Sequence, residues 1–448
     1  MLPVPEAEAR VAALVERAKR AGADAADAVY FGDSSTGMKV RLGKLEDVSR
    51  SEAEEVNLRV FVGRRSASVS SSDLSGDAVA ELVERVVAMA REAPEDPWAG
   101  LAPEERLARG ALPDVDGDDG GDPSPVELKA RALAAEEAAR AVPGVTNSEG
   151  AGISAARTIM ALATSHGFCR GYSTSGYSAS ASVIAGAGGG MQRDYDSHSV
   201  RHYARLDPPE AIGRRAGERA VARLDPSKIE SGGMPILFDP RVGSSLLGHF
   251  VTAITGGAIA RRTSFLLGKE GRQVFAPGIV IRDDPHRPQG LRSKPFDAEG
   301  VATAPSDLVA DGRLTGWLLD SASARQLGLQ PTGHATRGGS GAPGASATNV
   351  HLEPGPLSRA ALIAGVERGI YVTELIGQGV NPVTGDYSRG ASGFIIEGGE
   401  IGPSVAEITV AGNLLDMFLN LTPAGDLEFR HSANVPTLRI DGMTVAGA

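Results

Sequence analysis

Short stretches in which apolar and polar residues alternate recur through the first 200 residues, and this pattern limits the fold more than any other feature. The earliest examples are residues 27–31, 38–42, 56–62 and 67–70. Alternation with a period of two is typical of a β-strand that buries one face. The pattern therefore predicts a meander of antiparallel strands whose other face contacts water.

Helices are predicted on both sides of these strands in the sequence. Four stretches carry apolar residues with helical spacing: residues 6–21, 77–90, 124–140 and 207–224. The third has a clear start at Ser124-Pro-Val-Glu127, where a cap serine and a proline precede a glutamate. Residues 145–203 are again strand-like. Residues 1–92 and 124–230 are thus predicted to be two segments, each built of helices and antiparallel strands.

A polar stretch and a β-rich remainder complete the predicted organisation. Residues 93–123 contain many Asp, Gly and Pro, which predicts a solvated connection. Residues 231–448 contain a helix that starts near Asp239 and is expected to end at Gly256 and Gly257, followed mainly by strand signals. The predicted fold class is therefore α+β, with a barrel- or sandwich-like C-terminal domain.

Composition excludes several classes of protein. The 45 basic and 56 acidic residues give a net charge of −11, which argues against nucleic-acid binding through a general phosphate-neutralising surface but leaves a local basic patch open. No apolar run approaches the roughly 18 residues of a membrane helix, and no signal peptide is evident. The single cysteine, Cys169, excludes an intramolecular disulfide and any multi-cysteine metal site. We expect a cytoplasmic protein that binds neither membranes nor nucleic acid.

One pair of histidines has the spacing of metal ligands. His198 and His202 could aim two imidazoles from one helical turn at a zinc ion. The surrounding residues are strand-like, however, and no Glu lies between the two, so two surface histidines are the favoured interpretation. The other histidines stand alone and are interpreted as structural: His166, His249, His286, His334, His351 and His431.

Signals for other catalytic groups are weak. Gly338-Gly-Ser-Gly-Ala342 resembles the Gly-x-Ser-x-Gly motif of hydrolases but ends in alanine, and it is interpreted as a mobile loop. Cys169 is interpreted as a small buried hydrophobe rather than a nucleophile. Four carboxylates could pair but are expected in solvated loops: Asp283, Asp284, Asp297 and Glu299. No phosphate-binding glycine motif supports nucleotide chemistry.

The C-terminal part carries an ordered series of short motifs. In chain order they are Leu246-Leu-Gly-His249, Gly256-Gly257, Arg262-Thr-Ser264, Phe296-Asp-Ala-Glu-Gly300, Gly312-Arg-Leu-Thr-Gly316, Pro331-Thr-Gly333, Gly369-Ile-Tyr371, Asn381-Pro-Val-Thr-Gly-Asp386 and Gly412-Asn-Leu-Leu415. Their order and spacing resemble the TldD/PmbA family, also called the TldD/TldE metallopeptidases. The resemblance spans nearly the whole chain.

In the TldD type of this family, a His-Glu-x-x-x-His motif holds zinc on the helix that here begins near Asp239. The resemblance aligns its His, Glu and His with Leu247, Gly248 and Thr252, none of which supplies a zinc ligand or general base. No His-Glu-x-x-x-His occurs anywhere in the sequence. The chain therefore resembles the PmbA/TldE type, for which we expect no cofactor in this chain and zinc in the partner.

The resemblance implies a non-catalytic subunit of a heteromeric zinc metallopeptidase that degrades or processes unfolded peptides. The chain would complete the substrate chamber of a TldD-type partner, with Thr332, Gly333, His334 and Asn349 as candidate chamber residues. An alternative is a regulatory binding protein of the DNA gyrase modulator type, without a proteolytic role. A third hypothesis is an independent hydrolase that uses Ser or His.

Overall fold

The computed structural model describes residues 1–338 and 341–447, and it confirms the α+β class. Both N-terminal segments contribute to one antiparallel six-stranded sheet with the order β3-β2-β1-β4-β5-β6. The strands are β1 (Ala25–Arg41), β2 (Lys44–Val62), β3 (Arg65–Ser71), β4 (Val145–Thr164), β5 (Cys169–Ala185) and β6 (Gln192–Val200). The separate strand signals at 27–31 and 38–42 both belong to β1.

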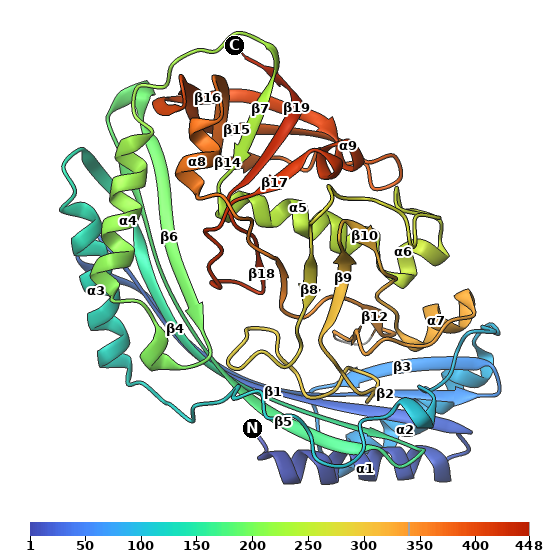
Figure 1. The fold of residues 1–448 in the computed structure, drawn as a ribbon. Helices are drawn as coiled ribbons and strands as arrows, with labels where there is room; N and C mark the ends of the chain where they lie inside the picture. The colour runs from blue at the N-terminus through green and yellow to red at the C-terminus, as the bar shows by residue number, and fades with distance from the viewer. Residues whose placement is uncertain (339–340, 448) are drawn as a thin grey trace.

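Four helices cover the outer face of this curved sheet, and the C-terminal half fills its inner side (Figure 1). They are α1 (Val4–Arg20), α2 (Gly76–Glu92), α3 (Pro125–Arg140) and α4 (Pro209–Ala222). Leu14 of α1 and Leu82 of α2 pack with Leu58 of the sheet, whereas Ile212 of α4 packs at the other end with Val183. The predicted helices thus cover the dry face of the strands, as their apolar stripes require.

The polar stretch at 93–123 packs more closely than its composition predicts. Leu107 and Ala108 are buried, and the Ala108 N–H donates to the Gly300 carbonyl at 2.8 Å. They belong to an apolar cluster that also contains Phe296 and Val301 of the C-terminal half. The expectation of a fully solvated connection is therefore wrong for these residues, because a few apolar side chains suffice to attach a polar segment to a neighbouring surface.

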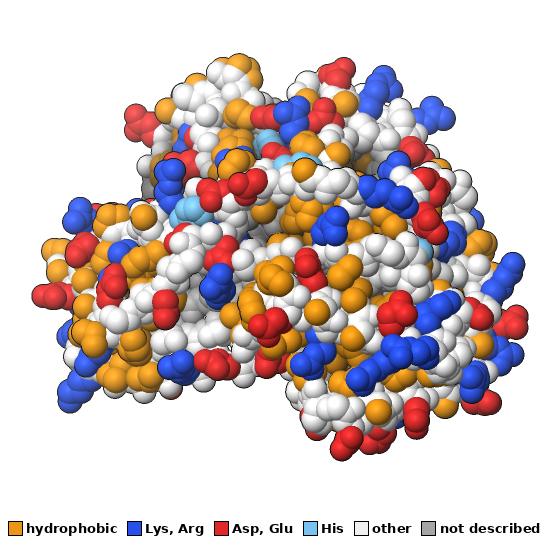
Figure 2. Space-filling model, turned by 90° about the horizontal axis from the view of Figure 1, so that it is seen from below, with side chains coloured by type: hydrophobic (Ala, Val, Ile, Leu, Met, Phe, Trp, Pro, Cys, Tyr) orange, Lys and Arg blue, Asp and Glu red, His pale blue; other side chains and the backbone are white. Residues whose placement is uncertain are grey.

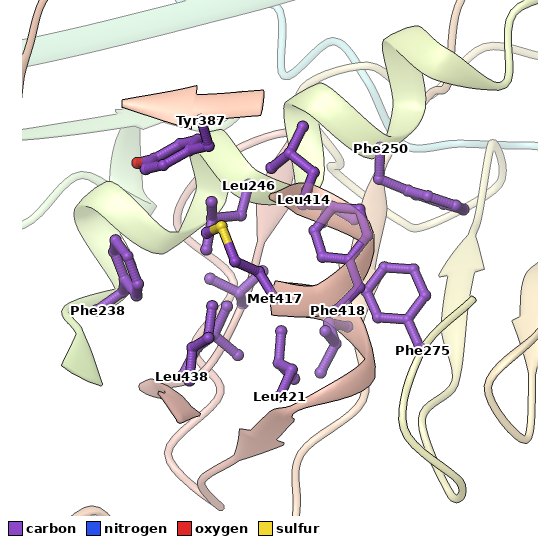
Figure 3. Packing of buried hydrophobic residues seen from close by; sticks show 14 of the residues in the cluster. Phe238, Leu246, Phe250, Phe275, Tyr387, Leu414, Met417, Phe418, Leu421 and Leu438 are labelled. Atoms are coloured by element: carbon purple, nitrogen blue, oxygen red, sulfur yellow. The ribbon is translucent and has the colours of Figure 1, made fainter. Parts of the chain in front are cut away.

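The C-terminal domain contains a closed five-stranded barrel, which confirms the barrel interpretation. Its strands are β7 (Gly232–Phe238), β14 (Arg368–Ile376), β15 (Asp386–Glu397), β16 (Glu400–Asn413) and β19 (Leu438–Ala446). The pairing of β16 with the last residues of β19 closes the ring, and β17 (Leu421–Pro423) pairs with the first residues of β19, on the edge opposite β7. Helices α5 (Pro240–Ala253) and α9 (Leu414–Leu419) pack aromatic side chains, including Phe250 and Phe418, into its core (Figure 3).

A second sheet lies between the barrel and the N-terminal sheet (Figure 1). Its order is β10-β9-β8-β13-β18, with β8 (Ile281–Asp283), β9 (Ser306–Ala310), β10 (Arg313–Leu314), β13 (Val350–Leu352) and β18 (Ala433–Asn434). The remaining elements are β11 (Ala335–Thr336), β12 (Gly344–Ala345), α6 (Gly256–Ala260), α7 (Ser321–Leu327), α8 (Arg359–Ala364) and three short 3-10 turns at Glu104–Arg106, Gly188–Gly190 and Tyr203–Arg205.

The two glycines expected to end α5 instead begin the next helix. Helix α5 ends at Ala253, and Gly256 and Gly257 open α6 without a positive φ at either residue. A Cβ on Gly256 would lie 2.2 Å from the Ser323 Oγ atom of α7. Glycine is therefore needed at 256 for the close approach of two helices, not for a left-handed backbone.

Acidic and basic side chains are mixed over the face of the molecule seen in Figure 2. The negative net charge is therefore not gathered into one acidic field on this face. No helix in the described part of the chain is long and apolar enough to cross a membrane.

Candidate functional site

Buried charges join the N-terminal sheet to the C-terminal half. Asp27 of β1 accepts hydrogen bonds from Arg59 Nε at 2.8 Å and from Arg337 Nη1 at 2.5 Å. Arg337, whose side chain is fully buried, also donates to Asn57 Oδ1. Burial raises the pKa of Asp27, but Arg337 and Arg59 outweigh it and hold that pKa below its ordinary value. One carboxylate thus bridges two guanidinium groups from different halves of the chain.

The same interface contains two of the carboxylates expected in solvated loops. Asp297 and Glu299 are buried, so the expectation is wrong for them, as it is for buried Asp283. Asp297 accepts three backbone N–H bonds at 2.9–3.0 Å, and Glu299 accepts the Ser321 N–H at 2.7 Å with Arg59 at 3.8 Å. Backbone donors replace the water that a loop carboxylate would otherwise need. Burial nevertheless raises the pKa of Glu299 to about 7.

A cleft of about 320 Å³ opens beside this network, between β1, β4 and β5 and the C-terminal half. We call it the interface cleft. Its lining consists of Phe31, Thr158, Met160, Tyr172, Thr174, Arg201, Leu291, Arg292, Ser293, Lys294, Phe296, Asp297, Ala298, Ala335, Thr336, Arg337, Ser346, Ala347 and Thr348. Four of these side chains are cationic and one is a carboxylate, so the cleft is basic within an acidic protein.

None of the four candidate chamber residues lines this cleft, and Asn349 lines a separate hollow of about 330 Å³ beside Leu291. Thr332 Oγ1 and His334 Nδ1 are 2.8 Å apart, and His334 Nε2 lies 3.3 Å from Asp283 Oδ2. Gly333 has a φ of +76°, and a Cβ there would meet the Ala302 carbonyl at 2.5 Å. These residues position the cleft-lining segments on either side of them. Their role toward a substrate remains a prediction.

Asn349, the fourth candidate, is buried and also has a positioning role. Its Oδ1 accepts the Arg292 N–H at 2.9 Å, and its Nδ2 donates to the Asp284 carbonyl and the Ser293 hydroxyl, each at 2.8 Å. Asn349 thereby fixes the loop that carries Arg292 and Lys294 into the interface cleft.

Helix α5 does not provide a zinc site at the positions suggested by the family resemblance. Leu247 is buried in the barrel core, Gly248 is exposed with open space around its Cβ position, and Thr252 Oγ1 donates to the Gly248 carbonyl at 2.9 Å. These residues do not fit a zinc ion. Across residues 1–338 and 341–447, no group of three or more His, Cys, Asp or Glu side chains is placed to hold a metal.

A larger cleft of about 650 Å³ lies at the start of α5. Its charged side chains are largely paired with one another or with the sheet. Arg219 Nη1 lies 2.6 Å from Asp196, Arg241 Nη1 lies 3.0 Å from Asp194, and Tyr371 donates to Asp239 at 2.8 Å. Three of its arginines, Arg219, Arg241 and Arg430, already have carboxylate partners, and the fourth, Arg359, lies over the Tyr371 ring, so this α5 cleft has less capacity to attract an anion than the interface cleft.

Small polar residues line the inner face of the sheet. Ser178, Ser180 and Ser182 of β5 border a groove of about 470 Å³, together with Gly37, Lys39, Asp47, Ser49, Gly152, Ser154, Arg193 and Tyr195. The alternate residues Ala179, Ala181 and Val183 are buried against α3 and α4. We call this hollow the strand-lined groove; it leaves room beside the sheet for an extended chain.

The remaining sequence candidates do not form a catalytic arrangement. His198 Nδ1 lies 3.0 Å from Asp207, and His202 Nε2 lies 3.2 Å from Asp116, so the two histidines have separate partners. Cys169 is half-buried beside α1, and burial raises its pKa. In the Gly338–Ala342 motif, residues 339 and 340 lie outside the described residues, and its serine is one of them.

No sequence motif marks the residues that make the interface cleft basic. Arg201, Lys294 and Arg337 stand in no recognisable motif, and 43 residues separate the last two in the chain. A local signal for a basic site is present in the run Arg287–Lys294, which contains three basic residues in an acidic chain. Only the fold brings this run to Arg201 of the sheet.

Sequence comparison relates the whole chain to known metallopeptidases. Models of the PmbA/TldA metallopeptidase domain 1, central domain and C-terminal domain match residues 26–90, 118–224 and 231–447. The metalloprotease PmbA of Escherichia coli O157:H7 is 38% identical over 426 residues, which cover 95% of this chain and 92% of the relative. A Haemophilus influenzae PmbA homologue is 37% identical over 454 residues, with 100% and 98% coverage.

Solved structures match the fold throughout. A Bacteroides thetaiotaomicron protein described as a candidate DNA gyrase modulator has a TM-score of 0.91 and 26% identity, covering 99% of both chains. TldE from Thermococcus kodakarensis has a TM-score of 0.88 and 21% identity, covering 98% of this chain and 100% of its own, and it supports the fold alone. On this sequence similarity, the chain belongs to the PmbA/TldD metallopeptidase family and, having no His-Glu-x-x-x-His, is of its PmbA type.

Proposed function

We propose that this chain is a non-catalytic subunit of a heteromeric zinc metallopeptidase that degrades or processes unfolded peptides. The observation that carries the proposal is the composition of α5, where Leu247, Gly248 and Thr252 occupy the positions aligned with the zinc ligands and base of the TldD type. A metallopeptidase needs a metal-bound water and a general base at such a site. The zinc therefore belongs to a TldD-type partner.

The contribution of this chain is then the shape and polarity of a substrate chamber. The strand-lined groove presents the hydroxyl groups of Ser178, Ser180 and Ser182 of β5, whose backbone N–H and C=O groups are already paired with β4 and β6. Serine hydroxyls can donate to and accept from the backbone of an extended peptide whatever its side chains. This arrangement suits unfolded peptides of varied sequence and explains why a second subunit would retain the fold without the metal.

The test is reconstitution with a homologue from the same organism that contains His-Glu-x-x-x-His. We expect the two chains to co-elute in size-exclusion chromatography, zinc to accompany the homologue, and peptidase activity to rise on mixing. A Glu→Gln change in the homologue's motif should abolish this activity. His249→Ala in this chain should leave it unchanged, because His249 packs against Tyr387 rather than facing other potential ligands.

A matched pair of variants tests the chamber itself. Ser180→Trp fills the strand-lined groove and should lower activity without preventing assembly, whereas Arg214→Trp, on the exposed side of α4, should have no effect. Absence of a complex, or equal activity of the homologue without this chain, would contradict the proposal. The regulatory binding function would then become the better explanation.

A further inference from the structure

Three cations of the interface cleft have no carboxylate within ion-pair distance in the described part of the chain. Arg201 donates from Nη1 to the Ser175 carbonyl at 2.9 Å and from Nη2 to the Leu291 carbonyl. Lys294 donates to the Ala335 carbonyl at 3.0 Å, and exposed Arg292 contacts the Ser346 hydroxyl at 3.3 Å. Carbonyl oxygens orient these groups but do not neutralise their charge.

Arg201 is the most informative of the three. It is half-buried, and its Nε atom is buried without a hydrogen-bond partner among the described residues. Burial lowers the pKa of Arg201, which is the mark of a charge that lacks compensation. A buried cation of this kind is costly unless an anion completes its environment.

The carboxylates near the cleft are already used elsewhere. Both oxygens of Asp297 accept backbone N–H groups, and Asp283 accepts the Thr348 N–H at 2.6 Å and the Thr348 hydroxyl at 2.7 Å. Asp27 is bound by Arg59 and Arg337. Asp297 and Asp283 nevertheless attract Lys294 and oppose the burial that lowers its pKa, whereas no carboxylate of the described residues acts in this way on Arg201. The positive charge of Arg201 is therefore the one left most available to a ligand.

An apolar surface adjoins the cations. Phe31, Met160, Tyr172 and Phe296 line the cleft, and the rings of Tyr172 and Phe296 meet edge to face with centroids 5.4 Å apart. Burial raises the pKa of Tyr172 to about 12, so its phenol keeps its proton at neutral pH. The cleft of about 320 Å³ thus presents cationic and apolar side chains next to one another.

We propose that the interface cleft binds the free C-terminal carboxylate of a peptide whose last side chain is apolar. The carboxylate lies against Arg201 and Lys294, and the side chain contacts the aromatic surface around Phe296. The planar fork of a guanidinium matches a carboxylate in shape as well as charge. This inference rests on the proposed function in naming a peptide as the ligand, and it adds which end of the peptide this subunit holds.

The test is a binding measurement on the isolated chain, which needs neither the partner nor peptidase activity. The probe is the peptide Gly-Gly-Ser-Ala-Leu, labelled with fluorescein at its N-terminus, either with a free C-terminal carboxylate or as its amide. Fluorescence anisotropy should show at least about tenfold tighter binding of the acid, the scale of a charge-assisted hydrogen bond lost from a buried site. Replacing the final Leu by Ser should weaken binding of the acid.

Arg201→Gln and Lys294→Gln should remove most of the preference for the acid, whereas Arg214→Gln, which deletes an exposed charge on α4, should keep it. Equal affinity for acid and amide, or no binding of either by the wild-type chain, would overturn the inference even if these variants misfold. Binding of inorganic phosphate with no preference for the peptide acid would also overturn it and would assign the site to a free oxyanion. Because activity is not measured, these outcomes are independent of the reconstitution experiment.

Discussion

The barrel core and the interface between the two halves are both buried, but different forces hold them. The barrel core is apolar, with the rings of Phe275 and Phe418 stacked at 4.4 Å and Phe250 edge-on to Phe275 (Figure 3). The interface instead buries the charges of Asp27, Arg59 and Arg337. Apolar packing loses stability in proportion to the volume removed, whereas a buried ion network depends on every member being present.

This difference separates the part of the molecule that gives rigidity from the part beside which we propose that a peptide binds. The closed barrel leaves no strand edge free around its ring, and its stabilisation by apolar burial is insensitive to charge. The interface network lies directly beside the interface cleft, and Arg337 belongs to both. Changes in pH should therefore affect the interface before they affect the barrel.

The largest effect is expected in the barrel core. Phe418→Ala should lower the free energy of unfolding by about 3–5 kcal/mol, because it removes a ring stacked on Phe275 and leaves a cavity. Chemical denaturation at several pH values should give the same loss throughout. Leu419→Ala, at an exposed position of the same helix, is the control and should cost far less. A loss of stability that varied strongly with pH would contradict the claim that the apolar barrel core is insensitive to charge.

Asp27→Asn should have the next largest effect, because it leaves two buried guanidinium groups without a shared carboxylate. We expect a loss of about 3 kcal/mol at pH 7. The pKa of Asp27 is lowered in the fold, so its contribution is present above the ordinary value of 3.8 and is lost as the pH falls. The difference between variant and wild type should thus shrink in acid.

The exposed Asp33 of the same strand provides the matched control for this change. Asp33→Asn should be nearly neutral in the same denaturation series. If Asp27→Asn were as mild as Asp33→Asn, the two halves would be held by contacts other than the buried ion network.

A smaller effect is expected where α6 meets α7. Gly256→Ala should cost about 1–3 kcal/mol, because its Cβ would lie within 2.7 Å of both Ser323 and Leu319. Gly257→Ala should cost little, since its nearest neighbour is the flexible end of Arg261 at 3.2 Å. Thermal unfolding of both variants shows whether glycine is needed here because neighbouring atoms lie close or because of its backbone conformation. Equal losses would favour the backbone explanation.

The sequence predicted the elements of the fold because their signals are local. The apolar stripe of α2 and the alternation along β5 each lie within one window of residues, so periodicity finds them. The continuity of β1 between residues 31 and 38 was harder to predict, since Gly32 and Gly37 interrupt the alternation although the strand continues. Cross-strand pairing with β2 and β4, which no local pattern records, holds that stretch extended.

The interface could not be predicted in the same way. Arg337 is 310 residues from Asp27 and 280 from Asn57, so no window contains the partners. Asp297 and Glu299 are polar residues in a loop, and only the fold supplies the amides and guanidinium groups that bury them. What the sequence contained was the family resemblance, which indicated the type of subunit but not the location of a basic cleft.

Glu299 tests whether the interface is more sensitive to pH than the barrel, because ionisation of this buried carboxyl destabilises the folded protein. Burial raises its pKa to about 7 from an ordinary value of 4.5, against the attraction of Arg59. A carboxyl with a raised pKa contributes its full stability below the unfolded value and loses it as the pH rises through the folded value. Wild-type stability from this group should therefore decline between about pH 4.5 and pH 7.

Glu299→Gln keeps the size of the side chain and an oxygen for the Ser321 N–H but cannot ionise. Relative to wild type, the variant should gain about 1–2 kcal/mol in unfolding free energy between pH 5 and pH 6.5, since one pKa unit corresponds to about 1.4 kcal/mol. Groups that titrate equally in both proteins cancel in this difference, and Phe418→Ala measured in the same series should show no such slope. A difference that stayed constant with pH would mean that Arg59 keeps Glu299 ionised throughout, and the interface would then be as insensitive to pH as the barrel.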